Sequence, residues 1–188
     1  MKKRTINMTL SSQSINDAIK QLEDYKKELQ DKTELFLEKL ADIGITVAKH
    51  EAAVNDDHKF YELGMVEFVK EWQDGYLHLI GRNADLSRLH THWYDGEGNP
   101  HDETISPILA LEWGTAGRAV PGHKGEFAVT GNHVNDTFWY YYTSLDENGK
   151  PDKDTKHVAT AVKPHEMMYK ATMEMMKEIK KVAKEVWG

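Results

Sequence analysis

The sequence predicts an α+β fold in which a long N-terminal helix and a C-terminal helix pack on one face of an antiparallel sheet. Two amphipathic patterns with helical spacing stand near the ends of the chain, one beginning at Ser14 and one at Pro164. Between them, Asp74-Gly75 separates two strand-like segments, as in a tight hairpin. A chain of 188 residues suits a single domain over residues 1–188. We therefore expect one layer of helix on one layer of sheet.

The N-terminal part begins with a predicted strand and continues as a helix. Residues 5–10 alternate polar and apolar side chains, which is typical of a half-buried strand. Ser14 stands three residues before Asp17 and is a suitable helix N-cap. Apolar residues then recur every seven positions, at Ile15, Leu22, Leu29, Phe36 and Ile43. This spacing predicts a single apolar stripe along a helix of about 35 residues.

The same helix could in principle pair as a coiled coil. Lys26 and Thr33 interrupt the second seam that such pairing needs, so the pattern favours a long helix lying across a sheet. If the sheet buries the stripe, truncating Leu29 or Phe36 to alanine should cost about 2–5 kcal/mol.

The middle of the chain predicts a hairpin followed by irregular segments. Residues 64–82 form two strand-like arms around Asp74-Gly75, whose residues supply the positive φ of a type I′ turn. Residues 83–106 are rich in His, Asp, Gly and Asn and have no clean period, and residues 114–126 are rich in Gly. We expect both of these segments to be long loops or insertions.

The strongest strand signal is the aromatic run Phe138–Tyr142, because bulky aromatic residues favour a pleated surface. A polar turn follows, and residues 157–162 can return as the next strand. The expected sheet therefore combines residues 64–82 with residues 138–162.

The C-terminal helix is expected to open at Pro164, where proline costs no hydrogen bond. Its apolar stripe runs through Met168, Met175 and Val182. The Met residues of segment 167–176 exceed what one buried stripe needs, and Met makes adaptable packing surfaces. They suit a subunit interface and a Met-rich core equally well. As interface candidates the sequence offers Met167, Met173 and Met176.

The composition of the chain argues against several classes of function. The chain has no Cys, which excludes disulfides and thiolate chemistry and agrees with a reducing cytosol. It has no apolar run long enough for a membrane span. Its net charge is −7, and residues 51–162 carry 19 acidic but only 9 basic side chains. An acidic middle repels a phosphate backbone, so sequence-specific nucleic-acid binding is not expected.

One cluster points to metal chemistry. His90 and His92 form an H-x-H pair, whose imidazoles would share one side of a strand, and Asp95 follows closely. A small metal-dependent hydrolase using His90 and His92 is therefore the alternative function. Nothing nearby marks a catalytic base on a rigid element, and the chain contains no nucleophile elbow or phosphate-binding loop. The sequence therefore predicts no enzyme, no cofactor and no catalytic metal.

Three segments, taken in order, resemble a known family. Leu109-Ala110-Leu111-Glu112-Trp113-Gly114-Thr115 is similar to the "(V/A)-E-(F/Y)-G-T" strand and turn of tail-component proteins of long-tailed bacteriophages. In that family a Gly/His-rich stretch and a Trp/Tyr-rich strand follow, here residues 116–135 and Phe138–Tyr142. The chain then ends with Ala161–Ala171 and Ile179–Trp187, which resemble "A-x-P-F-M-x-x-A…I…I-A-K-E-V-F".

The resemblance covers roughly residues 105–188, with two departures. His165-Glu166 replaces the family's aromatic residue after the proline, so the core anchor there is either lost or shifted to Met167. The His-rich segment 86–103 has no counterpart in the family pattern.

The resemblance implies a structural role without catalytic residues. Such proteins are tail-completion or head–tail joining (neck) components, which assemble as an oligomeric ring between the head connector and the tail tube. The implied partners are further copies of the chain and the connector or tail-tube proteins. The implied location is the virion, assembled in the host cytoplasm. The turn Trp113-Gly114-Thr115 is then a candidate partner contact, since loops on a rigid sheet often carry such contacts.

Overall fold

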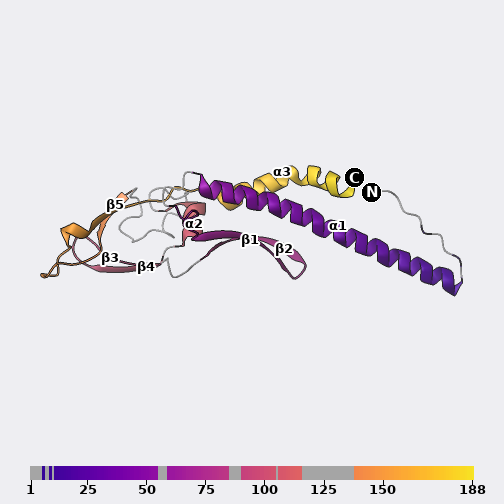
Figure 1. Ribbon diagram of the computed structural model, residues 1–188, viewed down its shortest axis with the longest axis horizontal. Helices are drawn as coiled ribbons and strands as arrows, with labels where there is room; N and C mark the ends of the chain where they lie inside the picture. Colours follow the sequence, from indigo (N-terminus) through magenta and orange to yellow (C-terminus); the bar gives the residue numbers. More distant parts are fainter. Residues whose placement is uncertain are drawn as a thin grey trace.

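A computed structural model describes residues 6, 9, 11–54, 59–84, 90–104, 106–115 and 138–188. Figure 1 shows an elongated α+β molecule, which confirms the predicted fold class. None of the described helices is long and apolar enough to span a membrane. In chain order the main helices and strands are α1 (Ser12–Ala53), β1 (Val66–Gln73), β2 (Tyr76–Asn83), β3 (His90–Tyr94), β4 (Pro100–Thr104), α2 (Pro107–Trp113), β5 (Phe138–Tyr142), β6 (Lys156–Thr160) and α3 (Met167–Trp187).

Helix α1 is longer than expected, with 42 residues, and begins earlier. Ser11 is its N-cap, and the Ser11 hydroxyl accepts a hydrogen bond from the amide of Ser14 at 3.3 Å. Ser14, the predicted cap, therefore lies inside the first turn. The strand expected over residues 5–10 falls almost entirely outside the described residues.

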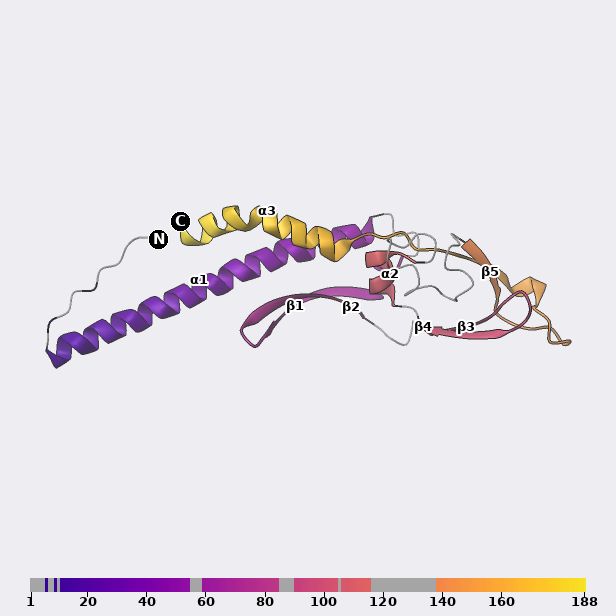
Figure 2. The ribbon, with the colours of Figure 1, turned by 180° about the vertical axis from the view of Figure 1, so that it is seen from behind.

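Helix α3 runs antiparallel along the C-terminal half of α1. Its N-terminal end is tied to the end of α1 by Lys170, whose Nζ lies 2.6 Å from Glu51 Oε2. Its C-terminal end reaches Phe36, whose ring centroid lies 5.0 Å from that of Trp187. Figures 1 and 2 show that the N-terminal half of α1 extends beyond α3 and the sheets. The apolar stripe of α1 is therefore covered over part of its length.

Strands β1 and β2 form the predicted hairpin, with positive φ at Asp74 (51°) and Gly75 (82°). One face of this two-stranded sheet lies on α1, where Lys70 Nζ meets Asp42 Oδ1 at 2.7 Å and Trp72 Nε1 donates to Glu38 at 2.8 Å. Gly44 allows this close packing, because a Cβ there would lie 2.7 Å from a methyl carbon of Leu79 and 2.8 Å from the sulfur of Met175.

The prediction of a single sheet from residues 64–82 and 138–162 is wrong. The described residues form two sheets, the β1–β2 hairpin and a separate four-stranded antiparallel sheet in the order β4-β3-β5-β6. Strands β3 and β4 come from residues 83–106, which were expected to form a long loop. Their polar side chains lack the apolar alternation that would have revealed a hairpin.

The core lies where α1, α3, α2 and the β1–β2 hairpin meet. Residues 107–113, which the family resemblance implied to be a strand and turn, form the short helix α2 instead. Leu111 on α2 and Met167 on α3 are fully buried there, among Phe68 and Val162. Helix α3 begins at Met167, so Pro164 precedes it rather than opening it.

Candidate functional site

Glu112 lies at a junction between α2 and the N-terminus of α3. Its carboxylate accepts hydrogen bonds from the backbone amides of Met168 at 2.8 Å and Tyr169 at 3.2 Å. Glu166, at the N-cap position itself, makes no side-chain capping bond and has a left-handed backbone (φ 53°). Glu112 therefore supplies from another helix the capping group that α3 lacks locally, and its negative charge suits the positive end of the helix dipole.

Backbone contacts extend this junction in both directions. The amide of Thr115 donates to Val162 O at 3.0 Å, and the Thr115 hydroxyl accepts from the Val162 amide at 2.8 Å. The amide of His165 donates to Leu111 O at 2.6 Å, and His165 Nδ1 lies 2.7 Å from Glu51 O, near the end of α1. The junction therefore joins α1, α2 and α3 through residues 111–115 and 161–169.

This arrangement corrects part of the interface expectation at the E-W-G-T turn. Gly114 and Thr115 are buried and stabilise the fold, so they offer no surface to a partner. Trp113 is half-buried and remains a candidate contact. Residues 116–126, the rest of the predicted loop, lie outside the described residues.

The Met-rich segment divides between core and surface. Met167 is fully buried in the core, so it offers no surface to a partner. Met173 and Met176 are exposed, Met176 by 60%. Two further exposed apolar residues of α3, Tyr169 and Ile179, lie near them by helical spacing, and neither was among the predicted interface residues.

Residues 90–104, which contain most of the His-rich segment, form the β3–β4 hairpin, and successive residues of each strand point to opposite faces of the sheet. On one face, His92 Nδ1 lies 2.7 Å from Asp102 Oδ1, and both side chains are well exposed. On the other face, the ring of His101 stacks on Trp93 with centroids 4.3 Å apart. The backbone of His90 belongs to β3, but its side chain lies outside what the structure describes.

Asp95 organises the turn of this hairpin instead of joining His92. Its carboxylate accepts from the amides of Glu97 and Asn99 and from the Asn99 side chain, each at 2.9 Å, and lies 3.2 Å from His101 Nε2. Burial alone would raise the pKa of Asp95, but the hydrogen bonds from Asn99, His101 and Glu97 outweigh it and hold that pKa well below its usual range. Asp95 is therefore a turn-forming residue whose oxygens are already engaged.

Among the described residues, no group of three or more His, Asp or Glu side chains is placed to hold a metal ion. We therefore expect the protein to retain no stoichiometric zinc or iron after dialysis, as measured by inductively coupled plasma mass spectrometry. Addition of EDTA should leave the melting temperature unchanged. One equivalent of bound metal that is lost in His92→Ala would contradict this and favour the hydrolase alternative.

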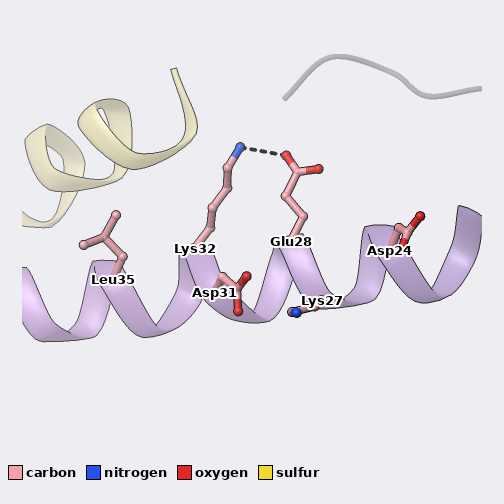
Figure 3. Close-up of a pocket in the computed structure, with 6 residues that line it drawn as sticks. All are labelled: Asp24, Lys27, Glu28, Asp31, Lys32 and Leu35. Atoms are coloured by element: carbon pink, nitrogen blue, oxygen red, sulfur yellow. Dashed lines mark ion pairs between the residues drawn. The ribbon is translucent and has the colours of Figure 1, made fainter.

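The groove shown in Figure 3 has a volume of about 370 Å³, and helix α1 alone supplies the residues that line it. Lys32 Nζ forms an ion pair across one turn with Glu28 Oε1 at 3.1 Å. Charged side chains on the face of a single helix do not by themselves make an enclosed binding site. The groove is therefore not a candidate binding or catalytic site. Its residues are Asp24, Lys27, Glu28, Asp31, Lys32 and Leu35.

The aromatic residues of β5 alternate between the two faces of the sheet. Tyr141 lies on the same face as Trp93, at a centroid distance of 6.3 Å, and stacks on His157. Phe138 and Tyr140 face the other side and are exposed. The Nζ of Lys156 stands 3.8 Å from the centre of the Tyr140 ring, a cation–π contact on this open face.

Comparison of the chain with protein-family models, with curated proteins and with solved structures found no match.

Proposed function

We propose that this protein is a structural virion component of a long-tailed phage that acts in tail completion or head–tail joining. In this proposal, copies of the chain assemble as a ring between the head connector and the tail tube. Heterologous contacts between identical subunits close such a ring when the rotation between neighbours is a whole fraction of a turn.

The observation that carries the proposal is the ordered resemblance, together with the contact between its two best-defined parts. The segments 109–115 and 161–171 are far apart in the sequence, yet Glu112 caps α3 and Thr115 pairs with Val162. The two segments, neither of which is distinctive alone, thus contact each other in a single junction.

Charge supports the same proposal. The chain carries a net charge of −7, and the excess of acidic residues falls in its middle. A ring at the neck must let DNA pass through its lumen, and an acidic lining avoids adhesion to phosphate.

The test is genetic disruption of this chain in the phage or prophage that encodes it. We expect lysates of the mutant to contain filled heads and separate tails, seen by negative-stain electron microscopy, and infectivity to return when the chain is supplied from a plasmid. Mass spectrometry of purified wild-type particles should detect the chain. Joined, infectious particles in its absence would overturn the proposal, as would its absence from the virion.

A further inference from the structure

The N-terminal half of α1 carries an apolar face that lies outside the packed part of the molecule. We call it the α1 seam, and it consists of Ile15, Ile19, Leu22 and Leu29. These side chains are between 38% and 55% exposed. Their spacing of three, four and seven residues places them on one side of the helix. A soluble helix normally buries such a stripe.

Helix α3 carries a second exposed apolar face. We call it the α3 stripe, and it consists of Tyr169, Met173, Met176 and Ile179. These side chains are between 40% and 61% exposed. Helical spacing places Tyr169, Met173 and Met176 on the side of α3 opposite the buried Ala171 and Val182, with Ile179 between the two sides. The apolar surface of α3 is thus wider than one helix contact requires.

The apolar repeat of the seam runs on into a part of α1 that another helix already covers. The seven-residue repeat of the seam continues to Phe36, and there the covering residue is Trp187 of α3. Beside it, Lys39 Nζ pairs with Glu185 Oε2 at 3.0 Å. The seam thus continues into a stretch of α1 that already packs on α3 of its own chain.

The part of α1 that carries the seam also matches helix α3 in length and charge. Residues 12–35 extend about 36 Å at the α-helical rise, and α3 with its 21 residues is about 31 Å long. Residues 12–35 carry six acidic and four basic side chains, whereas α3 carries three acidic and five basic ones. Lys177 and Lys180 follow Met173 and Met176 by four residues and so lie on the exposed side.

We propose that the α1 seam of one copy docks on the α3 stripe of a second copy. Each chain presents both surfaces, and in the proposed head-to-tail arrangement the contact is heterologous, so that one seam and one stripe stay free for the next copies. This inference names the subunit contact of the proposed ring and rests on the proposed self-assembly, but it can be tested on purified protein without a phage.

Cysteine cross-linking tests the contact directly, because the chain has no Cys of its own. Leu22→Cys and Met176→Cys are purified separately, mixed and oxidised with copper phenanthroline. Within one chain Leu22 lies about 21 Å from Phe36 along the α1 axis, toward the N-terminus and beyond the end of α3, whereas a disulfide needs Cα atoms within about 7 Å. We expect a covalent dimer of the two variants, identified by mass spectrometry of the linked peptides.

Leu35 provides the matched control. It lies on the same helix and is 48% exposed, but helical spacing places it on the side opposite the seam. Leu35→Cys should give at least fivefold less linkage to Met176→Cys than Leu22→Cys gives. Equal linkage from the two, or a predominant Leu22–Leu22 product from pairing of two α1 helices, would overturn the proposal.

Sedimentation velocity gives an independent readout. The unmodified protein should associate as its concentration rises, and Leu22→Glu or Met176→Glu should weaken this association at least tenfold, whereas Leu35→Glu should not. All three side chains are exposed, so circular dichroism should show unchanged helix content. A protein that stays monomeric at about 1 mM would overturn the docking. Separate heads and tails in the genetic test, with no cross-link here, would reject this contact alone.

Discussion

Leu111→Ala is expected to lower the free energy of unfolding by about 2–5 kcal/mol, as truncation of a fully buried leucine does. Leu111 is 0% exposed and belongs to the core cluster that joins α2 to α3 and to the β1–β2 hairpin. The backbone oxygen of Leu111 also accepts from the His165 amide, so a shift of α2 would disturb the junction. Chemical denaturation monitored by tryptophan fluorescence and circular dichroism measures the change.

Leu109→Ala is the control on the same short helix. Leu109 is 40% exposed, so the same chemical change removes less buried apolar surface and leaves no enclosed cavity. The loss for Leu109→Ala should be less than half of that for Leu111→Ala. Equal losses would mean that α2 does not pack as described, and the placement of the core would be wrong.

The elements that could be predicted from the sequence are those fixed by local patterns. The seven-residue repeat of α1 and the positive φ of Asp74-Gly75 are local properties, so the long helix and the β1–β2 hairpin were predicted correctly. The β3–β4 hairpin was missed because its strands are short and polar. Helix α2 was missed because a run of seven residues is too short for its period to separate helix from strand.

The extent of burial along α1 could not be predicted from its stripe. Leu29 and Phe36 occupy equivalent positions of the repeat, and both were expected to be buried. The structure shows Phe36 against Trp187, whereas Leu29 lies beyond the end of α3 and is exposed. A periodic pattern identifies the apolar face of a helix, but the length of the neighbouring helix decides how much of that face is covered.

In the candidate site, too, the sequence predicted local features but not those that depend on tertiary contacts. The sequence singled out the E-W-G-T turn and the Met-rich segment, and both take part in the structure around the junction. It could not reveal that Glu112 caps a helix that begins more than fifty residues later, because a cap supplied from a distant element leaves no local signature. It also could not separate the buried Met167 from the exposed Met176, which differ only in tertiary surroundings.

Glu112→Ala is expected to lower the free energy of unfolding by about 1–3 kcal/mol, the cost of removing a charged hydrogen-bond acceptor from a helix terminus. The substitution deprives the amides of Met168 and Tyr169 of their partner at the start of α3. Glu112→Gln keeps one acceptor oxygen but loses the charge, so its loss should be smaller. Amide hydrogen exchange should speed up at the start of α3 and hardly change in the β1–β2 hairpin.

Glu166→Ala separates this cap from a general effect of charge near α3. Glu166 holds the N-cap position but makes no capping bond from its side chain, and alanine keeps the same backbone demands at its positive φ. Its removal should therefore change the free energy of unfolding by less than about 0.5 kcal/mol. If Glu166→Ala cost as much as Glu112→Ala, the helix dipole would account for both effects, and the direct bonds from Glu112 would not. If only Glu112→Ala is destabilising, the glutamate of the E-W-G-T motif acts as a capping residue. The candidates for partner contacts in this region are then Trp113 and the α3 stripe.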